Sequence, residues 1–173
     1  VVTIVFRWMT DGSMGILTVM LRAVGLPAIS WAESPGAAMF QVVFLGFWLW
    51  SPFMIVSILA ALQNIPAQLY EAARVDGAGP IRQFFHVTLP HLASVLSIIV
   101  LLRMIWTFNN FDLIWLSTKG GPVGATETLP LLAYRKAFLM FDIDTGPKIA
   151  SASFFSLLAV VLIALKFFPI DQE

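Results

Sequence analysis

The stretch between Glu33 and Glu71 contains no charged residue, and this feature constrains the fold more than any other. Its central part, Met39–Leu62, would reach about 36 Å as a helix that rises about 1.5 Å per residue. A helix of that length crosses a bilayer core of about 30 Å with some tilt. The stretch therefore predicts a membrane-spanning helix.

Two further apolar stretches have the length of membrane spans. They cover about 91–110, interrupted by Arg103, and about 149–168, where Lys166 can extend its ammonium toward the membrane surface. Residues 1–9 have the character of the end of a fourth span. The composition agrees, since 59% of the residues are hydrophobic and 12% are charged, against about half and about a quarter in soluble domains. We predict an all-α, polytopic membrane helix bundle with three full spans plus the end of a fourth.

The residue chemistry argues against several classes of function. A net charge of zero offers no electrostatic support for nucleic-acid binding, and the absence of cysteine excludes disulfide frameworks and thiolate metal sites. His86 and His91 stand apart from acidic residues that could complete a metal site. No phosphate-binding glycine loop and no catalytic pair of acids is evident. We therefore predict that the chain is not an enzyme and holds neither a metal nor a cofactor.

The segment 63–90, between the first two spans, has the pattern of a short helix, a turn and a second short helix at the membrane surface. Pro66 suits the first turn of a helix. Leu69 and the 72–73 alanine pair form a narrow apolar face, on which small side chains allow close approach by a partner. Gly77 can take the left-handed conformation that ends a helix, and Pro80 can open the next.

The same segment carries a motif with several fixed spacings. Glu-Ala-Ala at 71–73 is followed by three residues, Gly77, nine residues, and then Val87-Thr88-Leu89-Pro90. This pattern resembles the EAA signature of permease subunits in binding-protein-dependent ATP-binding cassette (ABC) importers, in which Ile usually stands where this chain has Val87. The residues that the resemblance marks for coupling to the ATPase are Glu71, Ala72, Ala73, Asp76, Gly77, Leu89 and Pro90.

The resemblance implies a set of partners. In this family the EAA segment, here about 66–90, is a cytoplasmic coupling helix that docks into a groove on the ATP-binding subunit. Residues 1–173 would then be the C-terminal part of one permease transmembrane domain. The expected partners are ABC ATPase subunits, a second homologous permease, an extracytoplasmic solute-binding protein and the lipid bilayer, with ATP hydrolysed on a separate subunit. The alternative is an interfacial helix that only rests on lipid, which the small-residue face and the lack of lysine disfavour.

Further stretches resemble the carbohydrate group of these permeases, of the maltose and glycerol-phosphate types. They are Trp50–Met54, Phe108–Thr118 with Gly120–Pro122, and Thr126–Pro130 with Tyr134–Phe138. The Asp142–Lys148 stretch departs from the family pattern and leaves the start of the last span open. The resemblance implies import of a sugar or oligosaccharide. A permease for glycerol-3-phosphate, a polyol or another small solute is the alternative, and a non-conducting membrane anchor is the alternative from a different class.

Aromatic residues gather around Pro52 in the first span. Pro52 lacks an N–H group, which frees the carbonyl of Trp48. Irregular backbone inside a membrane is tolerated where it faces protein or a water-filled path. A packing kink filled by aromatic rings explains the pattern equally well. The candidate solute-path residues in this span are Trp48, Leu49, Trp50 and Phe53.

The second span carries polar residues at the spacing of one helical face, namely Arg103, Trp106, Thr107 and Asn110. Polar side chains inside a membrane mark solute pathways or bonds between helices, which a mere anchor does not need. We interpret Arg103 as structural, paired with a sister subunit or with Asp112. Trp106, Thr107, Asn109 and Asn110 are assigned to the solute path, and the resemblance also implies that Asn110 lies by the sugar site.

Two arguments about orientation disagree. The resemblance implies that the 63–90 segment and the C-terminus are cytoplasmic, in the cytoplasmic (inner) membrane of a bacterium or archaeon. Counting Lys and Arg puts more positive charge on the opposite side, and the positive-inside rule would place that side in the cytoplasm. We give precedence to the resemblance, because N-terminal spans usually dominate orientation and the rule weakens far from span ends.

Overall fold

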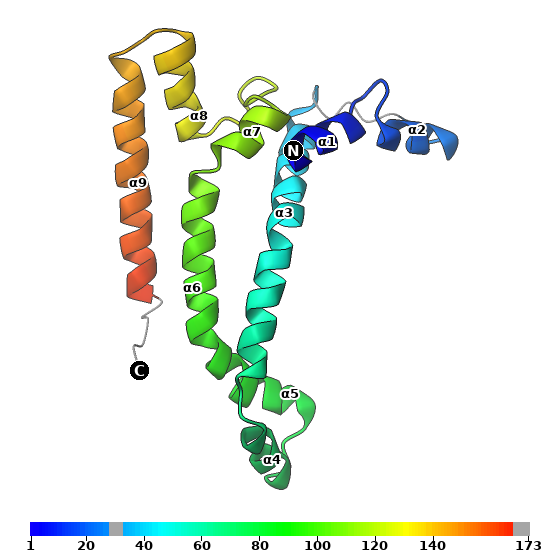
Figure 1. Cartoon of the computed structure of the whole chain (residues 1–173), viewed down its shortest axis with the longest axis vertical. Helices are drawn as coiled ribbons and strands as arrows, with labels where there is room; N and C mark the ends of the chain where they lie inside the picture. Colours follow the sequence, from blue (N-terminus) through cyan, green and yellow to red (C-terminus); the bar gives the residue numbers. More distant parts are fainter. Residues whose placement is uncertain (28–32, 168–173) are drawn as a thin grey trace. The chain divides into compact units, whose positions relative to one another are not determined.

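The computed structural model describes residues 1–27 and 33–167, and these residues form helices and connecting turns without a strand (Figure 1). The elements are α1 (Val2–Met9), α2 (Ile16–Ala23), α3 (Pro35–Gln63), α4 (Ala67–Val75), α5 (Pro80–Gln83), the π-helical segment η1 (Phe84–Thr88), α6 (Leu89–Phe108), α7 (Phe111–Ser117), α8 (Leu129–Tyr134), the π-helical segment η2 (Arg135–Leu139) and α9 (Thr145–Phe167). They form two compact units. The first contains residues 1–49 and 109–156, and the second contains residues 50–108 and the chain from Leu157 on.

Three helical stretches in the described residues are long and apolar enough to cross a membrane, Pro35–Gln63, Pro80–Phe108 and Thr145–Lys166. The predicted all-α membrane fold is therefore confirmed. The second stretch begins at Pro80 because α5, η1 and α6 follow one another without a break. Leu89 and Pro90 consequently lie inside a helix and not in a surface turn. Residue 168, the predicted end of the last span, lies outside the described residues.

The last span begins directly after the stretch that departs from the family pattern. Asp142 accepts a hydrogen bond from the backbone N–H of Thr145 at 2.9 Å, and so satisfies one of the free amides at the helix start. Hydrogen bonds from Thr145, mainly from its side chain and then from its backbone N–H, hold the pKa of Asp142 below its usual range. The carboxylate thus marks the point where α9 starts.

The first unit has a small apolar core built from three elements. Leu45 of α3, Leu113 and Ile114 of α7 and Leu131 of α8 are all buried in it. A Cβ atom at Gly120 would lie 2.8 Å from Leu131 Cδ2, so only glycine allows the turn after α7 to approach this core. The core therefore depends on one residue from a turn as well as on the helices.

Of the stretches that resemble carbohydrate permeases, those within 109–138 fold together in this first unit, whereas Trp50–Met54 belongs to the second. Rings at 111, 115 and 134 contact one another with centroids 4.9–5.9 Å apart. Arg135 pairs with Glu127 at 2.7 Å and donates to the carbonyl of Lys119 at 2.9 Å. These contacts stabilise the conformation of the 109–139 segment.

The second unit contains the helix–turn–helix at 66–83. Pro90 has no N–H for the carbonyl of His86 four residues earlier, and the π-helical segment η1 ends two residues before it, at Thr88. The side chain of His91 hydrogen-bonds the carbonyl of Val87 at 2.7 Å, which satisfies another backbone group of this irregular turn. The helix therefore continues without a break from Pro80 into α6.

Candidate functional site

The segment that carries the EAA motif forms a short helix, a tight turn and a second helix. α4 ends at Val75, and Gly77 adopts φ +74° in the turn, the left-handed conformation that the sequence predicts. Pro80 is the first residue of α5, also as predicted. Pro66 precedes α4 as its N-cap and is not part of its first turn.

One side-chain contact ties this helix–turn–helix to the start of α6, and a second stabilises its turn. The hydroxyl of Tyr70 in α4 lies 2.9 Å from the hydroxyl of Thr88, which is buried at the start of that span. Gln83 donates to the carbonyl of Ala78 at 2.7 Å and closes the turn. Sequence reasoning missed Tyr70 and Thr88. Their signal is a pair of hydroxyl residues, one just before the motif and one near its end.

The surface of this segment combines charges with large exposed apolar side chains. Glu71, Ala72 and Asp76 are exposed, and Val75 and Ile81 expose 88% and 75% of their surface. A hollow of about 480 Å³ on this surface is lined by Gly79, Pro80, Ile81, Arg82, Phe85 and His86. Large apolar groups exposed in this way are typical of a surface that binds a protein or a membrane.

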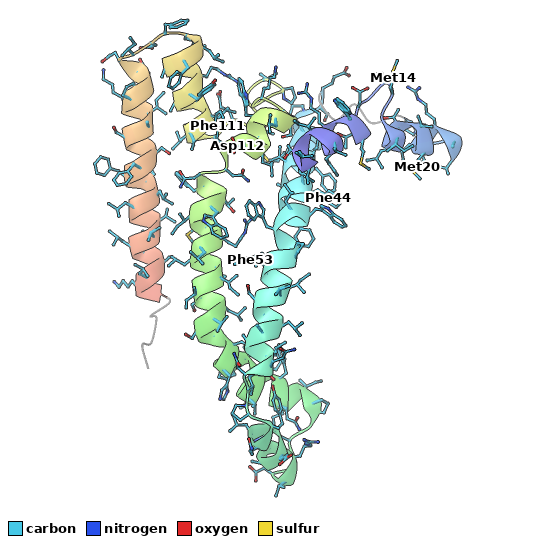
Figure 2. All side chains as sticks on the ribbon, viewed as in Figure 1. Met14, Met20, Phe44, Phe53, Phe111 and Asp112 are labelled. Atoms are coloured by element: carbon cyan, nitrogen blue, oxygen red, sulfur yellow. The ribbon has the colours of Figure 1, made fainter. Side chains whose placement is uncertain are left out.

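Four predicted residues of the two spans meet in a cluster of three rings and one cation. Trp106 contacts Trp50 and Phe53 with ring centroids 5.8 and 5.7 Å apart, and the guanidinium carbon of Arg103 lies 4.9 Å from the ring centre of Trp50. Figure 2 shows Phe53 on the side of α3 that faces α6. We name these residues the aromatic–arginine cluster.

The remaining predicted path residues of the first span lie elsewhere. Trp48 lines an apolar groove of about 650 Å³ with Phe40 and Phe44. Leu49 packs against the apolar core of the first unit. Because residues two apart on a helix point about 200° apart, Trp48 and Trp50 cannot present their rings on one face of α3.

The structure corrects the expected position of Asn110. The sequence placed it on one helical face with Arg103 and Trp106, but α6 ends at Phe108. Asn110 precedes α7 with φ −77° and ψ 76°, and its side chain does not cap that helix. The backbone turns at Asn109, so the helical period that relates 103 to 107 does not extend to residue 110.

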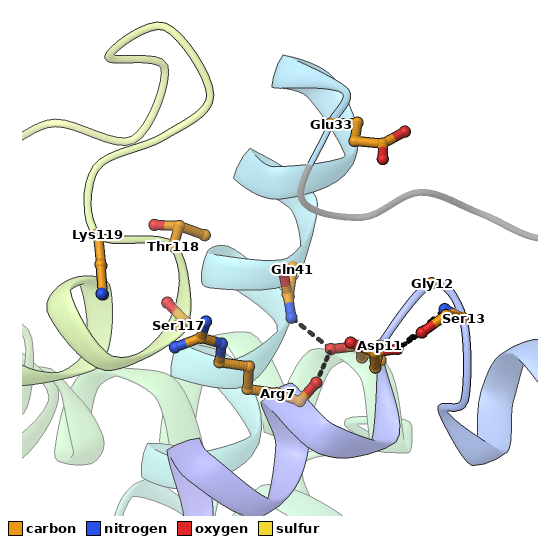
Figure 3. A pocket seen from close by; sticks show the side chains of 10 residues that line it. Arg7, Asp11, Gly12, Ser13, Glu33, Gln41, Ser117, Thr118 and Lys119 are labelled. Atoms are coloured by element: carbon orange, nitrogen blue, oxygen red, sulfur yellow. Dashed lines mark hydrogen bonds between the residues drawn. The ribbon is translucent and has the colours of Figure 1, made fainter.

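A polar pocket of about 450 Å³ in the first unit was not predicted (Figure 3). It is lined by Arg7, Thr10, Asp11, Gly12, Ser13, Glu33, Gln41, Ser117, Thr118 and Lys119. Gln41 is buried and donates to the hydroxyl of Thr10 at 2.5 Å, as the dashed line in Figure 3 marks. In the sequence, this pocket is indicated only by Gln41, a polar residue near the start of a long apolar run.

Asp11 carries a stable negative charge at the rim of this pocket. Its carboxylate accepts hydrogen bonds from the hydroxyl of Ser13 and from the backbone N–H groups of Met14 and Ser13, at 2.5, 3.0 and 2.9 Å. These bonds, with the Ser13 hydroxyl first, hold the pKa of Asp11 at about 2. Arg7 and Lys119 line the same pocket, so both signs of charge are present.

The two histidines have local roles in the backbone. His86 hydrogen-bonds the carbonyl of Arg82 at 3.0 Å, as His91 does with Val87. No group of three or more His, Asp or Glu side chains that could hold a metal ion occurs in residues 1–27 and 33–167.

Comparison with solved structures shows the fold. A bacterial ABC transporter involved in the import of the acidic polysaccharide alginate matches with a TM-score of 0.86, over 99% of this chain and 60% of that chain, at 21% identity. The bacterial alginate ABC transporter in complex with an alginate pentasaccharide-bound periplasmic protein gives a TM-score of 0.87 over the same shares.

In sequence, the chain is similar to permease proteins of several transport systems. The chain is 34% identical to the sulfoquinovosyl glycerol transport system permease protein of Agrobacterium fabrum, over 94% of this chain and 53% of that protein. It is 37% identical to the trehalose/maltose transport system permease protein of Thermococcus litoralis, over 91% and 53%. For the sn-glycerol-3-phosphate transport system permease protein of Yersinia pseudotuberculosis the identity is 35%, over 100% and 58%.

The chain thus spans between half and three-fifths of the length of these relatives. The family model described as "Binding-protein-dependent transport system inner membrane component" matches residues 1–168, which is almost the whole chain. Together with the three membrane-spanning helical stretches, this match identifies the chain as a member of the family of inner membrane components of binding-protein-dependent transport systems.

Proposed function

We propose that the chain is part of the permease subunit of an ATP-driven importer and contributes to the path of a sugar or oligosaccharide across the inner membrane. Its 63–90 segment docks on an ATP-binding cassette subunit in the cytoplasm, where ATP is hydrolysed. A second homologous permease completes the path, and an extracytoplasmic solute-binding protein delivers the solute. A non-conducting anchor is the alternative that the experiment below excludes.

The observation that carries this proposal is the surface of the helix–turn–helix. Val75 and Ile81 expose 88% and 75% of their surface on the segment that connects the first two spans, which also carries the exposed charges of Glu71 and Asp76 (Figure 1). Such side chains gain free energy when another protein covers them, about 25 cal/mol for each Å² of apolar surface removed from water. An ATPase groove with apolar walls and basic rims matches this surface.

The contact between Tyr70 and Thr88 supports a role in coupling. Thr88 directly precedes α6, so a displacement of α4 by a bound ATPase reaches that span through one hydrogen bond of 2.9 Å. A bound ligand shifts a conformational equilibrium only by its differential affinity for the two states. We therefore place the coupling residues at Glu71–Ala73, Asp76 and Gly77, with Tyr70 and Thr88 as the link and Leu89–Pro90 as the entry to the span.

The aromatic–arginine cluster supports a hydroxylated solute. The rings of Trp50, Phe53 and Trp106 offer apolar faces, and Thr107 offers a hydroxyl one residue farther along α6. Asn110 adds an amide that can donate and accept at once. The relatives above are named for transport of sulfoquinovosyl glycerol, trehalose or maltose, and sn-glycerol-3-phosphate, all rich in oxygen. A polyol or glycerol phosphate remains the alternative to a sugar.

The test uses the full-length permease with its partner permease and ATPase, reconstituted in vesicles. We expect ATP-dependent uptake of solute presented by the binding protein, and stable co-purification of the ATPase. The double variant Val75→Ser/Ile81→Ser should weaken ATPase binding, because it removes two exposed apolar side chains.

The matched control is Val123→Ser. Val123 is fully exposed at 101% but lies between α7 and α8, far along the chain from the motif. This variant should bind the ATPase as the wild type does. A wild-type complex that binds the ATPase but moves no solute would support the anchor, and uptake without any ATPase would refute the proposal.

A further inference from the structure

Arg103 and Trp50 leave two hydrogen-bond donors unsatisfied inside the membrane-spanning part of the chain. Arg103 Nη1 and Trp50 Nε1 are both buried, and neither finds an acceptor within residues 1–27 and 33–167. The ion pairs in the described part of the chain lie elsewhere, at Arg135 and Lys148. Because buried donors without acceptors cost free energy, we expect another group to meet them when the protein works.

The two donors are held in place by ring contacts. The guanidinium of Arg103 lies against the ring of Trp50 at 4.9 Å, and Trp106 packs against Trp50 at 5.8 Å. A cation–π contact uses the faces of the two groups and leaves their N–H edges free. The contact therefore positions the charge of Arg103 without using its hydrogen-bonding capacity.

The chemistry of the missing group follows from these donors. A guanidinium has only N–H donors and always carries a charge, and an indole offers one donor and no acceptor. A neutral hydroxyl would leave the charge of Arg103 unbalanced. A carboxylate, sulfonate or phosphate accepts from both donors and binds a guanidinium through two parallel bonds.

Arg103 also borders a space that can hold a ligand. It lines a hollow of about 460 Å³ together with Met54, Val100, Met104, Thr107 and Phe108. Thr107 stands one helical turn from Arg103 on the same face of α6. Its hydroxyl can donate to or accept from a hydroxyl group next to an acidic group on one molecule.

We propose that Arg103 and the indole N–H of Trp50 bind the acidic group of an anionic sugar or polyol derivative, while Thr107 binds a neighbouring hydroxyl. This inference rests on the proposed permease function and specifies its solute class. It adds a solute-binding role to Arg103, for which the sequence analysis gave a structural interpretation. Binding of this acidic group would make the path selective for anionic over neutral solutes.

The test measures binding of matched acidic and neutral solutes to the full-length importer complex in nanodiscs. The pairs are sulfoquinovosyl glycerol with glucosyl glycerol, glycerol-3-phosphate with glycerol, and a uronic-acid disaccharide with its neutral hexose counterpart. We expect at least one acidic solute to bind tenfold or more tightly than its neutral partner. Arg103→Met should lower that ratio about ten- to a hundredfold, as expected for bonds to a charged group.

Two further variants keep the test independent of folding. Trp50→Phe retains a ring for the guanidinium but removes the indole N–H, and should lower the ratio by up to about tenfold. Arg22→Met removes an exposed arginine of α2, outside the spans, and should leave the ratio at the wild-type value.

Four outcomes would overturn the inference. A wild-type complex that prefers the neutral solutes, or an Arg103→Met complex with an unchanged ratio, refutes it while the permease function stands. If Arg103→Met prevents assembly and Trp50→Phe assembles with an unchanged ratio, Arg103 pairs with protein and the inference is wrong. A wild-type complex that neither binds nor transports any of the six solutes refutes the proposed function as well.

Discussion

Gly77 permits a direct test of the coupling segment by backbone strain alone. Its φ of +74° is a conformation that side chains disfavour, yet a Cβ atom built at this position has nothing within 4 Å. A substitution here therefore adds conformational strain without a steric clash. Gly79, two residues later, also has open space around it, but its φ of −68° suits any residue.

The expected cost follows from these two angles. A residue with a Cβ atom in the left-handed region costs about 1–2 kcal/mol, which is a factor of about 5–30 in the population of the native turn. Gly77→Ala should pay this cost and Gly77→Val more, because β-branched residues are the poorest in this region. Gly77→Asn should pay least, since asparagine tolerates it, and Gly79→Ala should pay almost nothing.

The assay compares these variants in the reconstituted importer. If the native turn is the docking conformation, the apparent Kd for the ATPase rises as the population of that turn falls. We expect the order Gly79→Ala, Gly77→Asn, Gly77→Ala, Gly77→Val from tightest to weakest, and a parallel fall in solute moved per ATP hydrolysed. A Gly77→Val complex that binds ATPase and transports like Gly79→Ala would refute the reasoning.

Three other substitutions test separate parts of the chain. Tyr70→Phe removes the hydrogen bond to Thr88, worth about 0.5–1.5 kcal/mol, and should lower the transport-to-hydrolysis ratio with ATPase binding kept. Gly120→Ala combines φ +84° with a Cβ atom 2.8 Å from Leu131, and should lower stability by roughly 2–4 kcal/mol in thermal unfolding. Asn110→Ala should weaken solute affinity up to about tenfold in transport per assembled complex, through loss of one hydrogen bond.

For each of these three substitutions there is a control or an outcome that would contradict the prediction. Thr88→Val should reproduce the lower transport-to-hydrolysis ratio of Tyr70→Phe, and a wild-type ratio in both variants would contradict a link between α4 and α6 through this hydrogen bond. Gly36→Ala, with nothing within 4 Å of its Cβ, should unfold as the wild type does, and a similar midpoint for Gly120→Ala would contradict the packing argument. An Asn110→Ala complex with normal solute dependence would take Asn110 out of the path.

Sequence reasoning predicted the elements of local origin. The three membrane-spanning stretches follow from apolar runs, and the turn at Gly77 with the helix start at Pro80 follows from the backbone preferences of glycine and proline. The family also followed from the sequence, because the spacing from Glu71 to Pro90 is a property of the chain itself.

Sequence reasoning failed where helical periodicity was extended past a helix end. Asn110 was placed on the face of Arg103 because both fit one period, and the turn at Asn109 breaks that period. Trp48 was grouped with Trp50 as a nearby aromatic, although the two rings must leave α3 in different directions. The first error cannot be detected without knowing where the helix ends, whereas the second could have been detected from the helical period alone.

By itself, the sequence determined the class of fold and the family, since both depend on the length of apolar runs and on spacings along the chain. Only the tertiary structure decided which side chains meet. It brought Arg103 to the ring of Trp50 and left both with buried donors, and it joined Tyr70 to Thr88 and Gln41 to Thr10. These contacts join residues far apart in sequence, and their formation depends on helix packing, which no local pattern encodes.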